Sequence, residues 1–139
     1  MNERGAKKWI RWMPAAAVML LIFGHSAMPA SVSSAESGAV VGVLTKLFGL
    51  TEIPPGLTSL VRKTAHFGIF LLLGLCVRPN MRKGWHAALF CAAYAVTDEI
   101  HQYFVPGRSC EFRDVCIDSA GALAGILLWY FFRKRKGSQ

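Results

Sequence analysis

The stretch from residue 98 to 118 concentrates ionisable side chains between two strongly apolar blocks. Its carboxylates, arginines and single histidine are Asp98, Glu99, His101, Arg108, Glu111, Arg113, Asp114 and Asp118. A carboxylate and a histidine at a suitable distance can serve as general base and general acid, and a guanidinium group can hold an anion through two parallel hydrogen bonds. The stretch therefore indicates a site for acid–base chemistry or for an anionic ligand.

The rest of the chain has the composition of a membrane protein. Hydrophobic residues make up 53% of the 139 residues and come in blocks, while 16 basic and 8 acidic residues give a net charge of +8. A soluble chain this basic would suggest nucleic acid, but no signature of an RNA- or DNA-binding module is present. We therefore predict the lipid bilayer as a partner, no nucleic acid, and a single membrane domain over residues 1–139.

Four apolar blocks predict an all-α fold, a bundle of about four transmembrane helices. The expected spans cover about residues 9–28, 62–77, 85–104 and 115–132, and residues 29–61 form an outer loop. Two of the blocks are shorter than the roughly 20 residues that a span requires, so the helix is expected to continue past them. Arg62 and Lys63 would then extend their charged groups toward the interface.

Basic residues are unevenly distributed between the two ends of these spans. With the N-terminus inside, the inner segments hold 11 of the 16 basic residues and one acid, Glu3. Basic residues favour the cytoplasmic side, so both termini are predicted to be cytoplasmic in a multi-pass protein. All four tryptophans fall at inner ends, as an interfacial aromatic belt would: Trp9, Trp12, Trp85 and Trp129.

The first block and the outer loop each leave an alternative open. The first block is followed by Ser33-Ser34-Ala35, so it could also be a signal peptide that is cleaved. The outer loop is rich in Ser, Gly and Pro at its ends, but apolar residues recur at helical spacing between Val40 and Phe48. This spacing predicts a helix that either lies on the membrane surface or packs over the bundle.

Each predicted span carries one ionisable residue at a similar depth. At about 1.5 Å per residue from the inner end, the four lie roughly 17–21 Å deep, in the outer third of a hydrocarbon core about 30 Å thick. These residues are His25, His66, Asp98 and Asp118. Ionisable groups at this depth are costly without partners or water, so we expect them to form a polar pocket open to the outside.

The predicted pocket combines this layer with its neighbours at helical spacing and in the loop. Its residues are Arg62, Lys63, His66, Asp98, Glu99, Gln102, Arg108, Arg113, Asp114 and Asp118. If the protein is an enzyme, the candidate catalytic groups are His66, Asp98, Glu99 and His101. The bland alternative is that the charges only hold the outer ends of the helices together. Gly121 and Gly125 are expected to permit close helix packing rather than to carry chemistry.

Neither a cofactor nor a metal site is predicted. Two histidines and two aspartates could ligate zinc or a harder ion, but no local ligand motif such as HExxH is present. Ser109 and Ser119 have no evident base that would make either a nucleophile. Cys110 and Cys116 could pair with each other in an oxidising compartment.

Two motifs resemble the VanZ-like family: RKTAHF at 62–67 and TDEIHQYFVPGRSCEFRDVCIDSAGALAG at 97–125. The resemblance implies a small bacterial integral membrane protein of about four spans, in the plasma membrane. The family takes its name from a member of a glycopeptide-resistance cluster associated with reduced teicoplanin susceptibility. The residues that match the family pattern are Arg62, Lys63, His66, Asp98, Glu99, Gln102, Pro106, Gly107, Arg108, Asp114, Asp118 and Gly121.

The chain departs from the family pattern at two places. Many members carry Glu-Tyr shortly after the histidine, where this chain has Ile69-Phe70. Any role that requires a carboxylate there is therefore in doubt. His25 is not typical of the family either, so its place in the layer can be incidental.

Two functions fit these residues. The first is a non-enzymatic envelope protein whose outer pocket binds an anionic or lipid-linked ligand, such as a cell-wall lipid intermediate or a glycopeptide. The second is a membrane hydrolase or transferase acting on a lipid phosphate, with metal assistance if an ion is bound. We favour the first, because enzymes of lipid phosphates usually show a denser catalytic motif. Ion or proton transport fits less well, because the polar layer does not continue to the inner side.

Overall fold

A computed structural model describes residues 3–49 and 52–136, and all regular secondary structure in these residues is helical. The prediction of an all-α fold is confirmed. The helices are α1 (Glu3–Ser26), α2 (Ala30–Phe48), α3 (Leu57–Val77), the short 3₁₀ helix η1 (Arg78–Asn80), α4 (Gly84–Tyr103) and α5 (Phe112–Lys136).

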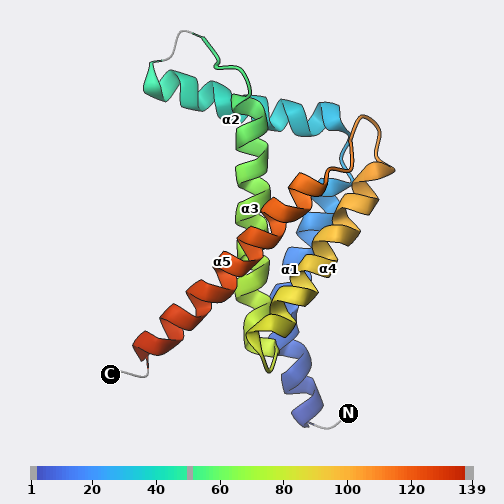
Figure 1. The fold of residues 1–139 in the computed structure, drawn as a ribbon, viewed down its shortest axis with the longest axis vertical. Helices are drawn as coiled ribbons and strands as arrows, with labels where there is room; N and C mark the ends of the chain where they lie inside the picture. The colour runs from blue at the N-terminus through green and yellow to red at the C-terminus, as the bar shows by residue number, and fades with distance from the viewer. Residues whose placement is uncertain (1–2, 50–51, 137–139) are drawn as a thin grey trace.

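Helices α1, α3 and α4 run lengthwise, α5 crosses α3 obliquely, and α2 lies across one end of them (Figure 1). The chain bends by 106° between α1 and α2, so α2 covers the end where α1 finishes and α3 begins. The first turn of α1 and the last turn of α5 lie toward the opposite end (Figure 1). We call these two ends of the bundle the α2 end and the terminal end.

Two helices of the described chain are long and apolar enough to cross a membrane. They are Leu57–Asn80, which joins α3 and η1, and Phe112–Arg135 in α5, each of 24 residues. A third candidate arises if the bent pair Trp9–Ser26 and Ala30–Phe48 is one span. The structure thus supports two to three candidate spans where the sequence predicts about four. Helix α4 is not among these candidates, and its last two turns carry Asp98, Glu99, His101 and Gln102. Helix α1 is a candidate only as part of the bent pair.

The predicted outer loop is helical over a longer stretch than expected. Helix α2 begins at Ala30, so it includes the Ser-rich start of the segment as well as the apolar stripe between Val40 and Phe48. The Ser37 hydroxyl donates to the Ser33 carbonyl at 2.9 Å, which satisfies a side chain that would otherwise compete with the helix. Ser33, Ser37 and Val41 form the buried face of α2, and α2 contacts α3.

The apolar stripe predicted on this segment faces away from the bundle. Val43 is 66% exposed, and Leu47 and Phe48 are more exposed still. The helix therefore packs over the bundle with one face and presents apolar residues on the other. Large apolar side chains are likewise exposed along α1 and α5, as expected where lipid replaces water around a bundle.

Close packing between α3 and α5 holds the bundle together. A Cβ atom at Gly121 would overlap the Phe67 carbonyl oxygen, and one at Gly125 would overlap the Leu71 carbonyl oxygen. Gly74 of α3 faces Ala122 in the same way. The prediction that Gly121 and Gly125 permit close packing is confirmed. Small residues let two helix backbones approach when hydrophobic burial cannot drive the association.

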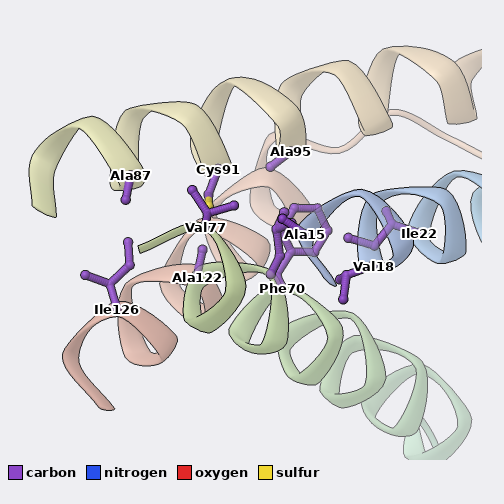
Figure 2. Packing of buried hydrophobic residues seen from close by; sticks show 11 residues of the cluster. Ala15, Val18, Ile22, Phe70, Val77, Ala87, Cys91, Ala95, Ala122 and Ile126 are labelled. Atoms are coloured by element: carbon purple, nitrogen blue, oxygen red, sulfur yellow. The ribbon is translucent and has the colours of Figure 1, made fainter. Parts of the chain in front are cut away.

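The hydrophobic core fills the space beside this crossing (Figure 2). Phe70 and Leu73 of α3 are fully buried, and α4 contributes small side chains at every fourth position. These small residues are Ala87, Cys91 and Ala95. The core positions α4 so that its polar last turns lie beside α3 and α5.

Candidate functional site

Three ionisable side chains from three helices meet inside the bundle toward the α2 end. They are His66 of α3, Asp98 of α4 and Asp118 of α5, and one ligand-type atom from each lies within 4.8 Å of the others. Asp98 is 4% exposed and Asp118 is 0% exposed. His66 Nδ1 lies 3.7 Å from Asp118 Oδ1, which is an ion-pair distance rather than a hydrogen bond. We call these residues the buried cluster.

Asp98 is held by two neutral donors. The Ser26 hydroxyl donates to Asp98 Oδ2 at 2.9 Å, and the Gln102 amide donates to the same oxygen at 2.8 Å. Ser26 is the last residue of α1 and is buried. These bonds fix the orientation of the Asp98 carboxylate and leave its other oxygen, Oδ1, without a hydrogen bond among the described residues.

Arg108 joins the loop after α4 to the end of α1. Its guanidinium group donates to Gln102 Oε1 at 3.0 Å and to the carbonyl oxygens of Met28 and His25 at 3.2 and 3.3 Å. All three acceptors are neutral. Burial lowers the pKa of Arg108, and repulsion from Arg62 acts in the same direction. Gly107, with φ of 75°, takes the left-handed conformation that brings the loop to this position.

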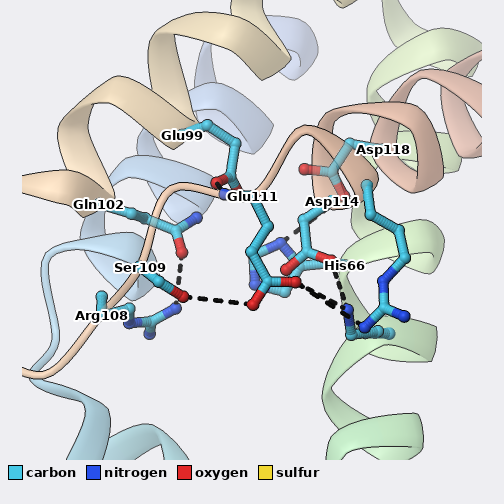
Figure 3. Close-up of polar contacts among 10 residues, drawn as sticks. His66, Glu99, Gln102, Arg108, Ser109, Glu111, Asp114 and Asp118 are labelled. Carbon is cyan, nitrogen blue, oxygen red and sulfur yellow. Dashed lines mark hydrogen bonds and ion pairs between the residues drawn. The ribbon is translucent and has the colours of Figure 1, made fainter.

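Glu111 and Asp114 lie on the side of the site near the start of α5 (Figure 3), and both lie close to Lys63 of α3. Lys63 Nζ donates to Asp114 Oδ1 at 2.6 Å and lies 3.7 Å from Glu111 Oε2. The buried carboxylate of Glu99 accepts a hydrogen bond from the Glu111 backbone N–H at 3.0 Å. Glu99 thus secures the loop, and Lys63 is neutralised by acids of α5 and the loop before it.

A small cavity of about 60 Å³ lies between these groups and the buried cluster. It has room for a few water molecules or one oxyanion group. Its lining is formed by Ala30, Arg62, Lys63, His66, Gln102, Gly107, Arg108, Ser109, Glu111, Asp114, Ile117 and Asp118. A second hollow of about 90 Å³, largely apolar, lies between α1 and α3 and also reaches His66.

Two members of the buried cluster have unmet hydrogen-bonding capacity. Both carboxylate oxygens of Asp118 are buried without a hydrogen-bond partner among the described residues, and so is His66 Nδ1. Buried polar atoms without partners are rare in folded proteins, and a buried charge without compensation is costly. These atoms are therefore available to bind an ion, a water molecule or a ligand group.

The structure brings most of the predicted pocket residues to one place. Seven line the cavity: Arg62, Lys63, His66, Gln102, Arg108, Asp114 and Asp118. Asp98 belongs to the buried cluster, and Glu99 holds the loop from behind. Arg113 lies outside, since its side chain is 71% exposed and contacts only Glu111 at 3.8 Å.

His101, one of the candidate catalytic groups, also lies outside the cavity. Its ring stacks on Phe23 of α1, with the ring centroids 4.4 Å apart. At about 100° per residue, positions three and four after Asp98 lie on opposite sides of it. Gln102 points toward Asp98 and Arg108, and His101 therefore points toward α1. His25, the fourth member of the predicted layer, is paired at 3.2 Å with Glu36 of α2.

The sequence interpretation missed Ser26 and gave no role to Glu111. A small hydroxyl residue directly after His25, at the end of the first apolar block, was an available signal for a partner of the layer. Glu111 was evident as a carboxylate, but its contacts with Lys63 and Ser109 depend on how the loop folds back. Cys110 and Cys116 are exposed and carry free thiols.

These features define an all-helical protein with membrane-type helices and a polar cluster that three helices build near one end. The VanZ/LLP1 family model matches residues 12–133. The chain therefore belongs to the VanZ/LLP1 family, and the resemblance carried by the motifs at 62–67 and 97–125 is confirmed. Comparison with curated proteins found no match, and comparison with solved structures found none.

Proposed function

We propose that the protein is a multi-pass protein of the bacterial plasma membrane with the α2 end outside and both termini in the cytoplasm. Helices α1, α3, α4 and α5 would cross the membrane, and α2 would lie at its outer surface. The support is the excess of basic residues at the terminal end, where 11 of 16 are found. Reporter fusions at Arg82 and Gln139 should both read cytoplasmic, and an external fusion at Gln139 would reject this arrangement.

In this arrangement, the cavity is an outward-facing pocket for the anionic group of a ligand. The observation that carries the proposal is that two arginines at the cavity have no acidic partner among the described residues. Arg62 lines the cavity and has no ion pair or hydrogen bond among the described residues, while Arg108 is bonded only to neutral acceptors. Two guanidinium groups without acidic partners at one small cavity favour an anion with several oxygens.

The ligand class that fits is a lipid-linked phosphate of the cell envelope, such as a cell-wall lipid intermediate. The pocket lies toward the α2 end, where such a headgroup would reach the protein from the outer leaflet. The apolar hollow between α1 and α3 adjoins it at His66 and suits an acyl or prenyl segment. A glycopeptide is the other ligand to test, in view of the resistance after which the family is named.

Binding of labelled cell-wall lipid intermediates to the purified full chain in nanodiscs tests this proposal. Arg108→Ala and Arg62→Ala should each weaken binding by about tenfold, because each removes a charge-assisted contact. Arg113→Ala is the matched control and should bind within about twofold, because an exposed charge outside the cavity is screened. Equal affinity in all three variants, or equal binding of the dephosphorylated lipid, would reject the proposed pocket.

A membrane hydrolase or transferase acting on a lipid phosphate is the second candidate. The observation that favours it is that His66 and Asp118 line the same cavity as the two arginines and that Asp98 lies beside them. Asp98→Asn distinguishes the two functions. Under the binding function it should weaken binding partially, whereas under the enzyme function it should abolish turnover of the labelled lipid and leave binding intact.

A further inference from the structure

We propose that the buried cluster of His66, Asp98 and Asp118 is a binding site for one divalent transition-metal ion, Zn²⁺ or Mn²⁺. Neither a sequence motif nor the family match assigns a metal to this chain. The inference depends on the buried cluster alone. It holds whether or not the cavity above the cluster binds an anionic ligand.

The geometry of the three side chains suits a metal better than direct pairing. Ligand atoms on one tetrahedral Zn²⁺ lie about 3.4 Å apart, given bond lengths of about 2.0–2.2 Å. His66 Nδ1 and Asp118 Oδ1 are already 3.7 Å apart, too far for a hydrogen bond and close to this spacing. All three ligand atoms lie within 4.8 Å, so small side-chain rotations bring Asp98 to the same ion.

The unmet hydrogen-bonding capacity points into the same space. Asp118 is 0% exposed, and both of its oxygens lack a hydrogen-bond partner among the described residues. His66 Nδ1, the atom that faces Asp118, lacks one as well. A metal ion would satisfy the histidine nitrogen and a carboxylate oxygen at once, whereas an ion pair between His66 and Asp118 leaves Asp98 uncompensated.

Charge balance favours a divalent cation at this position. Two buried carboxylates face one histidine, and among the described residues no lysine or arginine forms an ion pair with either carboxylate. Lys63 is paired with Asp114 and Glu111, and Arg108 reaches Asp98 only through Gln102. A divalent ion would neutralise both carboxylates, and the metal would bind to a neutral imidazole.

The groups around Asp98 are those that orient a metal ligand. Ser26 and Gln102 both bond to Oδ2 and leave Oδ1 available, and Gln102 is itself held by Arg108. Such outer hydrogen bonds fix the direction of a ligating carboxylate and are worth about 10–100-fold in metal affinity. One imidazole and two carboxylates suit Zn²⁺ and Mn²⁺ better than Ca²⁺, which prefers six to eight oxygens.

Three protein ligands leave at least one coordination position open. His66 and Asp118 also line the 60 Å³ cavity, so the open position would face the space bordered by Arg62 and Arg108. A water molecule or an oxygen of an anionic group could occupy it. In metalloenzymes an open position of this kind is what distinguishes a catalytic metal from a structural one.

The test is metal binding by the full chain, purified in detergent, stripped with a chelator and equilibrated with Zn²⁺ or Mn²⁺ alone. We expect one ion per chain by elemental analysis. Asp118→Asn, Asp98→Asn and His66→Gln should each lower the affinity by more than about tenfold, since each removes a ligand. Glu36→Gln makes the same carboxylate-to-amide change on α2, beside His25, and should bind like the wild type.

A second measurement keeps the test decisive if one variant fails to fold. Co²⁺ bound to the wild type should show visible absorption bands of a site with mixed nitrogen and oxygen ligands, and Zn²⁺ should displace it. The proposal is overturned if the wild type binds less than one metal ion for every several chains. It is also overturned by equal retention of metal by Glu36→Gln and any of the three cluster variants that folds. Loss of lipid binding in Arg62→Ala with metal content unchanged separates failure of the pocket from failure of the metal site, because Arg62 lines the cavity and makes no hydrogen bond to the buried cluster or its neighbours among the described residues.

Discussion

Arg78 at the terminal end and Asp118 toward the α2 end are both buried polar residues beside the α3–α5 crossing, but their surroundings differ. The Arg78 guanidinium donates to the Met81 carbonyl and to the Tyr130 hydroxyl, each at 2.7 Å. It also lies 4.6 Å from the ring centroids of Trp129 and Tyr130. Nε is its one nitrogen without a hydrogen-bond partner among the described residues. Asp118 has no hydrogen bond at all among the described residues.

The other polar groups follow the same division. At the terminal end, Arg11 donates to the Pro79 carbonyl at 2.7 Å, and the Asn80 amide donates to the carbonyls of Arg11 and Cys76. These are neutral acceptors that close the ends of helices. Toward the α2 end, Asp118 and His66 have buried polar atoms without a hydrogen-bond partner among the described residues. The described polar groups of the terminal end therefore contribute to stability, whereas Asp118 and His66 are expected to cost stability unless a bound group satisfies them.

The largest expected effect on stability comes from disrupting the close contact between α3 and α5, on which both ends of the bundle depend. Gly125→Ala places a methyl group against the Leu71 carbonyl, so it should lower the free energy of unfolding by about 3 kcal/mol. Gly68→Ala on α3 is the matched control, because nothing lies within 4 Å of its added Cβ. It should be neutral or stabilise by about 0.5–1 kcal/mol. Unfolding in mixed micelles, followed by tryptophan fluorescence, measures both.

Arg78→Ala should lower the free energy of unfolding by about 2 kcal/mol, because two hydrogen bonds from a charged donor are lost. The same unfolding assay measures this, and Tyr130→Phe should cost about half as much. Lipid and metal binding should be unchanged in protein that remains folded. A stability change below that of Tyr130→Phe would contradict the role assigned to the terminal end.

Asp118→Asn should change the free energy of unfolding in the opposite direction. In chelator-treated protein it should raise the free energy of unfolding by about 1 kcal/mol, because a neutral amide of the same shape replaces a buried carboxylate whose oxygens accept no hydrogen bond among the described residues. With Zn²⁺ present the order should reverse, since ligand at 100 times its Kd stabilises the wild type by about 2.7 kcal/mol. Thermal unfolding with and without Zn²⁺ gives both values, and a variant less stable than the wild type in chelator would remove the contrast between the two ends.

The smallest effect is expected at His101, which marks the boundary of the site. His101→Phe keeps the stacking on Phe23 and should change the free energy of unfolding by less than about 0.5 kcal/mol. Lipid binding, turnover if present, and metal content should match the wild type. A loss of any of these by tenfold would place His101 in the site after all.

The sequence by itself determined the class of the protein and the residue types of the site. Uninterrupted apolar blocks dictate helices wherever backbone polar groups must be satisfied without water, and this argument needs no partner helix. The depth count selected His66, Asp98 and Asp118 for the same reason, since rise per residue is a local property of a helix. It also selected His25, which the structure pairs with Glu36 outside the buried cluster. The glycines at 121 and 125 signalled a close contact.

Only the tertiary structure decided which way each polar side chain points and what it meets. In a span that is apolar all round, periodicity does not identify the face that points into the bundle. The sequence therefore could not tell whether His101 or Gln102 contacts Asp98. The packing of the helices places His101 against Phe23 and Gln102 against Asp98. The fold of the loop brings Arg108 to the cavity, whereas Arg113 lies outside it. It also places the Glu111 backbone N–H where it donates to the Glu99 carboxylate. Such contacts depend on how α3 and α5 cross, which is set by atoms far apart in the chain.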